Sequence, residues 1–364
     1  MFRFLHAADF HLDSPFSALP PEKAAERRRE SRGLPARLAE YANANHVQLV
    51  LLSGDLLDGD NPYRETAEAL RDALGRIHAP VFIAPGNHDP YTASSPYAAL
   101  DWPENVHIFS SAGLEAAEVP GLSAVVYGAA FTGPEQRESL LSGFRAPLDG
   151  KCRLMVLHGE LDPAEPRYDP VSREDAAGSG LAYLALGHIH KRGKLRCGGT
   201  LCAWPGCPEG RGFDELGEKG FYLGTAADDG AVTLEFVPFA RHRYEILEAD
   251  VTGRDPLKAV EALLPPDTAG DLYRIVLTGE AGEPGVDLAA LSEALTPRFY
   301  ALELRDRTRA AEDLWARAGE DSLRGLFLRE LRGCLKKAGS DSERAAVEMA
   351  VRYGLAALDH RDLG

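Results

Sequence analysis

The chain lacks any apolar run that approaches the roughly 20 residues needed to cross a bilayer. Its first residues, MFRFLHAADFHLD, are interrupted by the polar His6 and Asp9, and no small-residue cleavage site follows them. This start is unlike a secretory signal. We therefore expect a cytoplasmic protein that has no membrane partner.

Cysteine is also scarce. The chain has five cysteines, and the odd number argues against a disulfide framework. Cys197, Cys202 and Cys207 lie five residues apart, whereas a zinc knuckle has two residues between its ligands. We predict reduced thiols that hold no metal cluster.

Basic residues are few relative to acidic ones: 40 Lys and Arg stand against 56 Asp and Glu, a formal net charge of -16. Binding to a phosphate backbone normally draws on clustered Lys and Arg, so this balance disfavours a nucleic-acid partner. It does not disfavour phosphoester chemistry, because bound divalent ions supply positive charge locally. At 364 residues the chain exceeds one ordinary core, which predicts a large domain with smaller appendages.

Short apolar runs rich in Val, Ile, Leu and Phe indicate buried strands. They lie at residues 2–7, 47–53, 80–85, 123–129, 153–158 and 181–187. Charged, periodic stretches at 21–45 and 64–77 separate the first three runs and predict amphipathic helices. The alternation of strands and helices is typical of an α/β domain.

The remainder of the chain predicts two smaller parts. Runs at 218–226 and 231–239 flank Asp228, Asp229 and Gly230, which suits a hairpin that closes the first domain near residue 240. Residues 241–306 alternate strand, helix, strand, helix and strand, which predicts a small α/β capping module. Residues 307–364 carry apolar residues at helical spacing and no strand pattern, which predicts a helical tail.

Polar residues with metal-binding chemistry follow five of the predicted strands, at or just past their carboxyl ends. These residues are Asp9, His11, Asp55, Asp58, Asn87, His88, His158, His188 and His190. Open α/β sheets place their active sites at this edge, so the five segments should meet. Glycines before Asp55, Asn87 and His188 allow sharp turns and close backbone approach.

This donor set predicts a metal site. Each residue taken singly fits a structural histidine or a turn aspartate, but five of the eleven histidines fall within the set. Mixed nitrogen and oxygen ligands suit Mn, Fe or Zn better than Ca or Mg.

The ordered set Asp9-x-His11, Gly54-Asp55-x-x-Asp58, Gly86-Asn87-His88-Asp89, His158 and Gly187-His188-x-His190 resembles the calcineurin-like metallophosphoesterase superfamily. The resemblance implies a two-sheet α/β sandwich flanked by helices, with two divalent metal ions, for which Mn is the first expectation. By analogy, one ion would be held by Asp9, His11, Asp55 and His190. The other would be held by Asp55, Asn87, His158 and His188, so that Asp55 bridges the two.

The resemblance also implies the chemistry. Two nearby cations lower the pKa of a bound water and clamp the phosphoryl oxygens during in-line attack. His88 would contact no metal and would lie beside the scissile phosphate, where it stabilises charge or protonates the leaving alkoxide. We further hypothesise that Asp58 accepts a hydrogen bond from His88 and fixes its tautomer, although an ordinary turn aspartate remains the alternative.

Within the superfamily, several features resemble bacterial DNA repair exonucleases of the SbcD and YhaO type. They are the segments HAADFHLDSPF and WPGCPEGRGFDELGEKGFY, the capping module and the tail. This implies a DNA exonuclease or endonuclease subunit whose tail docks on an SbcC/YhaN-like coiled-coil ATPase. The sequence leaves open whether the protein forms a homodimer.

Two other functions compete with this one. A phosphodiesterase or phosphatase that acts on nucleotides or other small phosphoesters is favoured by the acidic charge. A non-catalytic scaffold is disfavoured because such proteins typically lose ligands or the catalytic histidine, and this chain keeps all of them.

Two further segments allow more than one interpretation. The segment Pro205 to Lys219, with Arg211 and Lys219, could contact a phosphate chain or could be a structural loop. A run of arginines on the first predicted helix alternates with glutamates, which favours a solvated helix face over a nucleic-acid patch. These arginines are Arg27, Arg28, Arg29 and Arg32.

Overall fold

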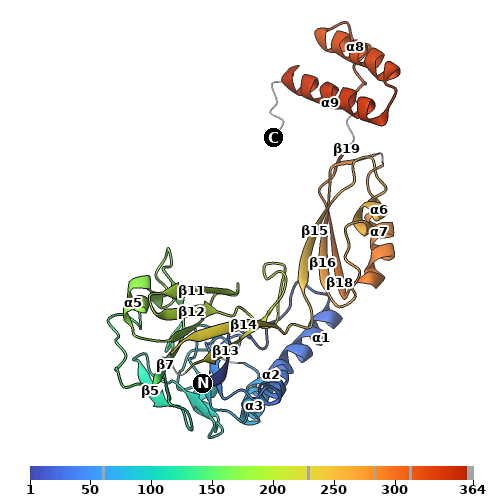
Figure 1. The fold of residues 1–364 in the computed structure, drawn as a ribbon. Coiled ribbons are helices and arrows are strands. Elements are labelled where there is room, and N and C mark those ends of the chain that lie inside the picture. Colours follow the sequence, from blue (N-terminus) through green and yellow to red (C-terminus); the bar gives the residue numbers. More distant parts are fainter. Residues whose placement is uncertain (60–61, 228–229, 283, 311–313, 359–364) are drawn as a thin grey trace. The chain divides into compact units, whose positions relative to one another are not determined.

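The computed structural model describes residues 1–59, 62–227, 230–282, 284–310 and 314–358 (Figure 1). The chain divides into two compact units. The first comprises Met1–Leu247, Pro265–Arg274 and Leu295–Glu303, and the second comprises Glu248–Leu264, Ile275–Ala294 and the described residues from Leu304 onward. No helix in the described ranges is long and apolar enough to span a membrane. The predicted turn residues Asp228 and Asp229 lie outside the described residues.

The first unit contains two six-stranded sheets. The first sheet has the order β14-β13-β1-β2-β3-β4, in which β1 to β4 are parallel and β13 and β14 run antiparallel at one edge. Its strands are β1 Phe2–Ala7, β2 Leu49–Leu52, β3 Val81–Ile83, β4 Val106–Ile108, β13 Gly220–Ala226 and β14 Val232–Pro238.

The second sheet has the order β11-β12-β10-β7-β6-β5, with a parallel centre and antiparallel pairs at both edges. Its strands are β5 Glu115–Glu118, β6 Ala124–Gly128, β7 Cys152–His158, β10 Tyr183–Gly187, β11 Gly193–Cys197 and β12 Thr200–Trp204. A short parallel pair, β8 Glu160–Leu161 and β9 Pro170–Val171, follows β7. The two-sheet α/β sandwich predicted from the sequence is confirmed.

Side-chain alternation along the strands builds separate apolar layers. In β7, Leu154 and Val156 belong to the core between the sheets, while Met155 and Leu157 belong to the layer on the outer face of the second sheet. Successive residues of a strand point to opposite faces, so a strand buried on both sides is apolar throughout. This explains why the central strands were visible in the sequence as continuous apolar runs.

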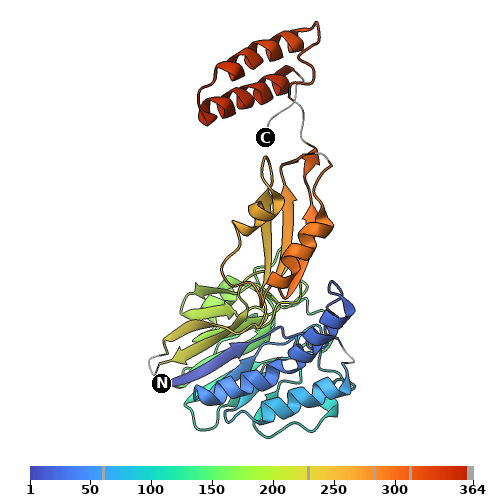
Figure 2. The same ribbon diagram turned by 90° about the vertical axis from the view of Figure 1, so that its right-hand side faces the viewer.

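Helices cover the outer face of the first sheet (Figure 2). The stretch predicted as helical at 21–45 forms two helices, α1 Pro21–Arg32 and α2 Leu34–Ala44, separated at Gly33. Pro35 lies in the first turn of α2, where its missing N–H costs nothing, and it could not continue α1. The third helix is α3 Arg64–Gly75. Two short helices follow, α4 Pro96–Ala99 and α5 Arg173–Gly178.

Arg27 corrects one prediction, because it is fully buried and does not lie on a solvated helix face. Its guanidinium donates to Glu209 Oε1 at 3.1 Å, to Glu30 Oε2 at 2.9 Å and to the carbonyl of Gly210 at 3.0 Å. A buried charge persists only when it is paired and hydrogen-bonded, and Glu209 supplies that pairing from 182 positions away. The charge pattern of the helix alone could not reveal this partner.

The region after residue 243 contains a three-stranded sheet in the order β15-β16-β18. Its strands are β15 Tyr244–Asp250, β16 Leu272–Thr278 and β18 Ala301–Asp306. The helices of this region are α6 Pro256–Glu261 and α7 Leu288–Leu295, followed by the 3-10 turn η1 Thr296–Arg298. The predicted order of strands and helices is confirmed.

The helical C-terminal region is also confirmed, as α8 Leu323–Lys337 and α9 Asp341–Leu358. Leu314, Ala318, Leu328 and Val351 form its small core. One element differs from the prediction, because β19 Arg309–Ala310 pairs in parallel with β17 Glu280–Ala281. A strand of two residues is too short to produce a detectable period.

Within the second unit, Glu280 connects β17 to α9. The Glu280 carboxylate, whose side chain is 8% exposed, accepts hydrogen bonds from Arg352 Nη2 at 2.9 Å and from Arg309 Nη2 at 3.2 Å. The bonds from Arg352 lower the pKa of Glu280 below its usual value of 4.5. Since the pKa is lower in the folded state, this stabilisation is fully present above pH 4.5 and is lost as the pH falls towards the folded-state pKa.

We expect Glu280→Gln to lower the free energy of unfolding of this unit at pH 7 by about 1–2 kcal/mol, because it removes charge-assisted hydrogen bonds. Urea titrations followed by circular dichroism at pH 7 and at pH 3.5 measure the effect, which should shrink at the lower pH. Glu248→Gln, an exposed change in the same unit, is the matched control. Equal destabilisation at both pH values would contradict the ion-pair explanation.

Candidate metal centre

The structure brings the sequence-predicted residues together at the carboxyl ends of the parallel strands. Asp9 and His11 follow β1, Asp55 follows β2, and Asn87 and His88 follow β3. From the second sheet, His158 is the last residue of β7, and His188 and His190 come directly after β10. Backbone bonds tie these segments to one another: Asp9 N donates to the carbonyl of Gly54 at 3.0 Å, and His11 N donates to that of Asp55 at 2.9 Å.

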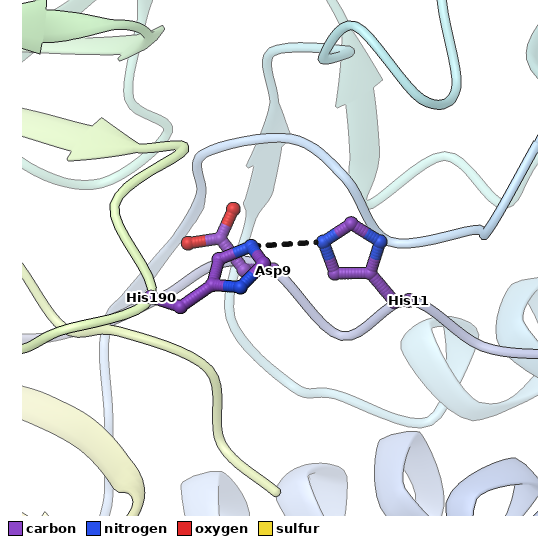
Figure 3. A group of neighbouring side chains, drawn as sticks. All are labelled: Asp9, His11 and His190. Carbon is purple, nitrogen blue, oxygen red and sulfur yellow. Dashed lines mark hydrogen bonds between the residues drawn. The ribbon is translucent and has the colours of Figure 1, made fainter. Parts of the chain in front are cut away.

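Asp9, His11 and His190 form the first group of potential ligands (Figure 3). The Nε2 atoms of His11 and His190 face each other at 3.1 Å. Oδ2 of Asp9 is buried and finds no hydrogen-bond partner among the described residues, while Oδ1 accepts the backbone N–H of His188 at 2.9 Å. An unpartnered buried carboxylate oxygen beside two converging imidazole nitrogens fits a cation at this point.

Asp55, His158 and His188 form the second group. Asn87 lies at its centre, with Oδ1 at 2.9 Å from His158 Nε2 and 3.1 Å from His188 Nδ1. Different strand ends therefore present two imidazole nitrogens and two side-chain oxygens to one point. Such a mixed nitrogen and oxygen set suits Mn, Fe or Zn.

Asp55 lies between the two groups. Its Oδ2 is 3.3 Å from His158 Nε2 in the second group and 3.6 Å from His11 Nε2 in the first. Its other oxygen, Oδ1, accepts the backbone N–H of His88 at 2.9 Å, which fixes the orientation of the carboxylate. The Asp55 carboxylate therefore faces both groups.

Several of these residues adopt a backbone conformation that L-amino acids rarely use. Asp9, His11, Asp55 and His188 have φ values of 56°, 44°, 52° and 78°. A non-glycine residue in the left-handed region costs about 1 kcal/mol or more, and such residues concentrate where function requires them. Four strained positions in one cluster support the interpretation of this edge as the functional site.

Two positions beside the cluster require glycine, because no side chain would fit there. A Cβ atom on Gly86 would lie 2.3 Å from Asp55 Oδ1, and one on Gly187 would lie 1.9 Å from the carbonyl oxygen of Ser53. Real Cβ atoms do not approach this closely, so neither position admits a side chain without displacing the cluster. The predicted need for close backbone approach is confirmed at both glycines.

Burial and mutual charge set the protonation of the groups. Burial alone would lower the pKa of His158, but the charges of Asp55 and Asp9 raise it to about 9. Burial, with the nearby charge of His158, lowers the pKa of His188 to about 3. Burial also raises the pKa of Asp9. A crowded set of carboxylates and imidazoles in a dry site is strongly coupled, which is the situation a bound cation relieves.

The outward ring nitrogen of each imidazole in the two groups has a partner of its own. His11 Nδ1 is 3.2 Å from Asp58 Oδ1, and His158 Nδ1 is 2.8 Å from the carbonyl of Ser53. His188 Nε2 is 2.9 Å from Glu160 Oε1, and His190 Nδ1 is 2.7 Å from Glu215 Oε1. Glu160 and Glu215 were missed in the sequence, although Glu160 is two residues from His158 and Glu215 belongs to the segment noted for its arginine and lysine.

His88 is the half-exposed member of the cluster, with 47% of its side chain accessible. Its Nδ1 lies 3.4 Å from Asp58 Oδ1, and the hydrogen bond to Asp58 raises the pKa of His88. Asp58 was predicted to accept a hydrogen bond from His88. It also faces His11, and its second oxygen accepts from Ser14 Oγ at 2.9 Å. Asp58 is thus shared between a residue of the first group and the exposed histidine.

The segment from residue 205 to 219 is mainly a structural loop beside the cluster. Lys219 is 8% exposed, and its Nζ donates to the carbonyl of His190 at 3.2 Å. Arg211 donates to Glu215 Oε1 at 2.7 Å and to Ser14 Oγ at 3.3 Å. Both basic residues are therefore occupied by protein partners, which favours the structural of the two interpretations left open by the sequence.

Asp89 organises the loops under the cluster without facing either group. Its buried carboxylate accepts the backbone N–H groups of Asp55, Leu56, Leu57 and Gly86 and the hydroxyl of Tyr97, at distances of 2.6–3.1 Å. One side chain thus binds the loop after β2 to the loop after β3.

We expect Asp89→Ala to lower the free energy of unfolding of the first unit by about 3–5 kcal/mol, because it leaves several buried donors without acceptors. Tyr97→Phe removes one of those donors and should cost about 1 kcal/mol. Urea unfolding monitored by tryptophan fluorescence measures both. A loss below that of Tyr97→Phe would show that Asp89 does not hold the two loops together.

Comparison with known proteins places the cluster in a family. The family model described as calcineurin-like phosphoesterase matches residues 2–192, which include every residue of the two groups. The chain belongs to the calcineurin-like phosphoesterases. It is 33% identical over 299 residues to the uncharacterized metallophosphoesterase YhaO of Bacillus subtilis, covering 77% of this chain and 72% of that protein.

More distant relatives of this phosphoesterase carry nuclease or repair names. It is 28% identical over 242 residues to the DNA double-strand break repair protein Mre11 of Saccharolobus solfataricus, covering 61% of this chain and 60% of that protein. It is 34% identical over 93 residues to one of the subunits of the nuclease SbcCD of Rhodobacter capsulatus, covering 24% and 22%. A solved dimetal phosphatase from Danio rerio aligns over 61% of this chain and 92% of its own, at 13% identity and a TM-score of 0.40.

Membership of this family makes the chain a hydrolase of phosphoesters, and the family uses two divalent metal ions. The residues present fit that requirement: two groups of ligand atoms converge, the Asp9 oxygen lacks another partner among the described residues, and Asp55 faces both groups. The fit also opposes a scaffold function, since no residue of the predicted set is displaced from the cluster.

Proposed function

We propose that this phosphoesterase is the nuclease subunit of a DNA repair complex and cleaves phosphodiesters with two Mn ions. In this proposal Asp9, His11, Asp55 and His190 hold one ion. Asp55, Asn87, His158 and His188 hold the other. Bound there, the ions supply a Lewis acid for the phosphoryl oxygens and an activated water.

The protein's own side chains have separate tasks in this proposal. His88, exposed and unclaimed by either group, meets the phosphodiester and protonates the leaving oxygen or stabilises charge on phosphorus. Asp58 accepts a hydrogen bond from Nδ1–H of His88, which turns Nε2 towards the substrate. Asp55 keeps the two ions together because its carboxylate faces both groups.

We choose DNA as the substrate because relatives of this chain are named as a nuclease subunit and as double-strand break repair proteins. The name of one relative marks it as one subunit of a nuclease, which supports a partner for this chain as well. We assign catalysis to residues 1–240, a capping role to residues 241–306, and docking of a coiled-coil ATPase to the helical tail, residues 307–364. Leu323, Leu326, Met349 and Tyr353 leave an apolar surface on α8 and α9 that such a helical partner could cover.

A second candidate function is hydrolysis of nucleotides or other small phosphoesters. The net charge of -16 favours it, because a long polyanion would be repelled outside the immediate reach of the ions. It shares the site and the mechanism with the first candidate and differs only in the substrate.

Rates of Mn-stimulated hydrolysis separate the two candidates. The purified chain would be assayed on single-stranded DNA, on blunt duplex ends, on cyclic nucleotides and on bis(p-nitrophenyl) phosphate, with and without a co-expressed coiled-coil ATPase from the same genome. DNA degradation that rises with the ATPase supports the nuclease. Turnover of small esters beside intact DNA under both conditions would replace it with the second candidate.

A further inference from the structure

We propose that Glu215 and Glu160 are positioning residues, each of which sets the affinity of one metal position by orienting one imidazole. Glu215 acts through His190 on the first position, and Glu160 acts through His188 on the second. This inference rests on the proposed ligand assignment. It adds two residues to that assignment, each of which affects a different metal position.

Nδ1 of His190 faces Glu215 and also lies 3.0 Å from Nη2 of Arg211. We assign the Nδ1 hydrogen bond to the closer Glu215 carboxylate, because a cation on Nε2 requires the proton on Nδ1. The Glu215 carboxylate is almost fully buried, and Oε1 lies 2.7 Å from His190 Nδ1. A neutral imidazole carries one proton, so a ring that donates Nδ1–H to Glu215 has its lone pair on Nε2. That Nε2 atom is the one that faces His11 Nε2 at 3.1 Å in the group with Asp9.

Arg211 in turn fixes Glu215. Its Nη2 donates to Oε1 at 2.7 Å, and its backbone N–H donates to Oε2 at 2.8 Å. Both carboxylate oxygens are therefore engaged by one residue four positions away, which holds the Glu215 side chain in place. A carboxylate held in this way orients the imidazole more strictly than a free one would.

Glu160 has the same relation to His188 with the ring nitrogens exchanged. Its Oε1 lies 2.9 Å from His188 Nε2, and the opposite nitrogen, Nδ1, faces Asn87 Oδ1 at 3.1 Å. The ring of Tyr168 lies against His188 with 4.5 Å between centroids, which limits rotation of the imidazole. Nδ1 is thus the inward nitrogen in the second position, whereas Nε2 is inward in the first.

The two glutamates are expected to hold their imidazoles with different strength. The Glu215 side chain is 4% exposed and ion-paired with Arg211, whereas the Glu160 side chain is 24% exposed. Loss of a carboxylate that orients a metal-binding histidine typically weakens metal binding about 10–100-fold. We expect the larger loss for Glu215, because water can replace part of the contact at the more exposed Glu160.

The experiment measures Mn binding to the metal-free full chain by isothermal titration calorimetry. Wild type should bind two Mn ions. Glu215→Gln should weaken one of them about 30–100-fold and leave the other within about threefold. Glu160→Gln should weaken the other ion about tenfold. Glu218→Gln, an exposed change three residues from Glu215, is the matched control and should bind as wild type.

A double-mutant cycle separates positioning from general structural damage. In a His190→Ala background, Glu215→Gln should cause no further loss of Mn affinity, because Glu215 acts only through that ring. Thermal unfolding of the metal-free proteins checks the fold. If Glu215→Gln unfolds because Arg211 is left unpaired, Arg211→Met combined with Glu215→Gln removes the buried charge, and the same titration applies.

The outcomes separate the two proposals. Wild type that fails to bind two Mn ions would overturn the ligand assignment itself. Wild type that binds two, with Glu215→Gln binding both normally, weakening both equally or adding its loss to that of His190→Ala, would overturn the positioning role alone. A selective loss that vanishes in the His190→Ala background supports it.

Discussion

Replacing Asp55 with Asn should reduce phosphodiester hydrolysis by about 10³-fold or more and should abolish binding of two Mn ions as a pair. Asp55 Oδ2 approaches both groups, at 3.3 Å from His158 Nε2 and 3.6 Å from His11 Nε2. Two metal ions stabilise transition-state charge by several kcal/mol, and a loss of about 4 kcal/mol corresponds to roughly 10³ in rate.

The amide of Asn has nearly the same shape as the carboxylate, so the fold should survive this change. Oδ1 can still accept the backbone N–H of His88. Activity on DNA and on bis(p-nitrophenyl) phosphate, together with calorimetric Mn titration, measures the effect. Asp101→Asn, an exposed aspartate at the surface, is the matched control and should match wild type. Retention of two tightly bound ions in Asp55→Asn would remove the bridging role from the proposal.

The sequence was sufficient for the fold because the central strands are buried on both faces. Residues 49–52 and 183–187 are apolar throughout, and each forms a central parallel strand in the structure. Strands β5 and β11 were missed for the opposite reason: they form edges with exposed, polar residues, so neither shows a continuous apolar run. Strand β4 was missed because it has only three residues. Strand β12 was missed although Leu201, Cys202 and Ala203 are apolar and buried.

The inner residues of the cluster were predictable because the motif places them at strand ends, where a parallel sheet brings them together. The supporting contacts were not. Glu209 reaches Arg27 across 182 positions, and Glu215 reaches His190 from a loop that no strand or helix pattern places. A carboxylate in a loop has the same appearance in a sequence whether it is solvated or buried against an imidazole.

Asp58 also shows that a sequence motif does not reveal every contact of the residues in it. Its sequence position suggested one partner, His88, at what proves to be 3.4 Å. The closer imidazole is His11, whose Nδ1 lies 3.2 Å from the same oxygen. Removal of Asp58 should therefore affect metal binding through His11 as well as protonation of His88, and its substitution alone cannot isolate the role of His88.

The direct substitution His88→Asn isolates that role. We expect kcat to fall about 10²–10⁴-fold, the usual contribution of a general acid or base, while both Mn ions bind with unchanged affinity. The expectation follows from geometry: His88 is 47% exposed and lies with His11 and Asp58, outside the groups that contain Asp9 and Asp55.

The measurement pairs steady-state rates on bis(p-nitrophenyl) phosphate and DNA with Mn titration of the same protein. His78→Asn, an exposed histidine outside the cluster, should leave both quantities unchanged. A substrate with a better leaving group should be less affected by His88→Asn if the ring donates a proton, because a good leaving group needs no acid. Equal losses for good and poor leaving groups would assign His88 to stabilising charge on phosphorus, and unchanged kcat would exclude it from the chemistry.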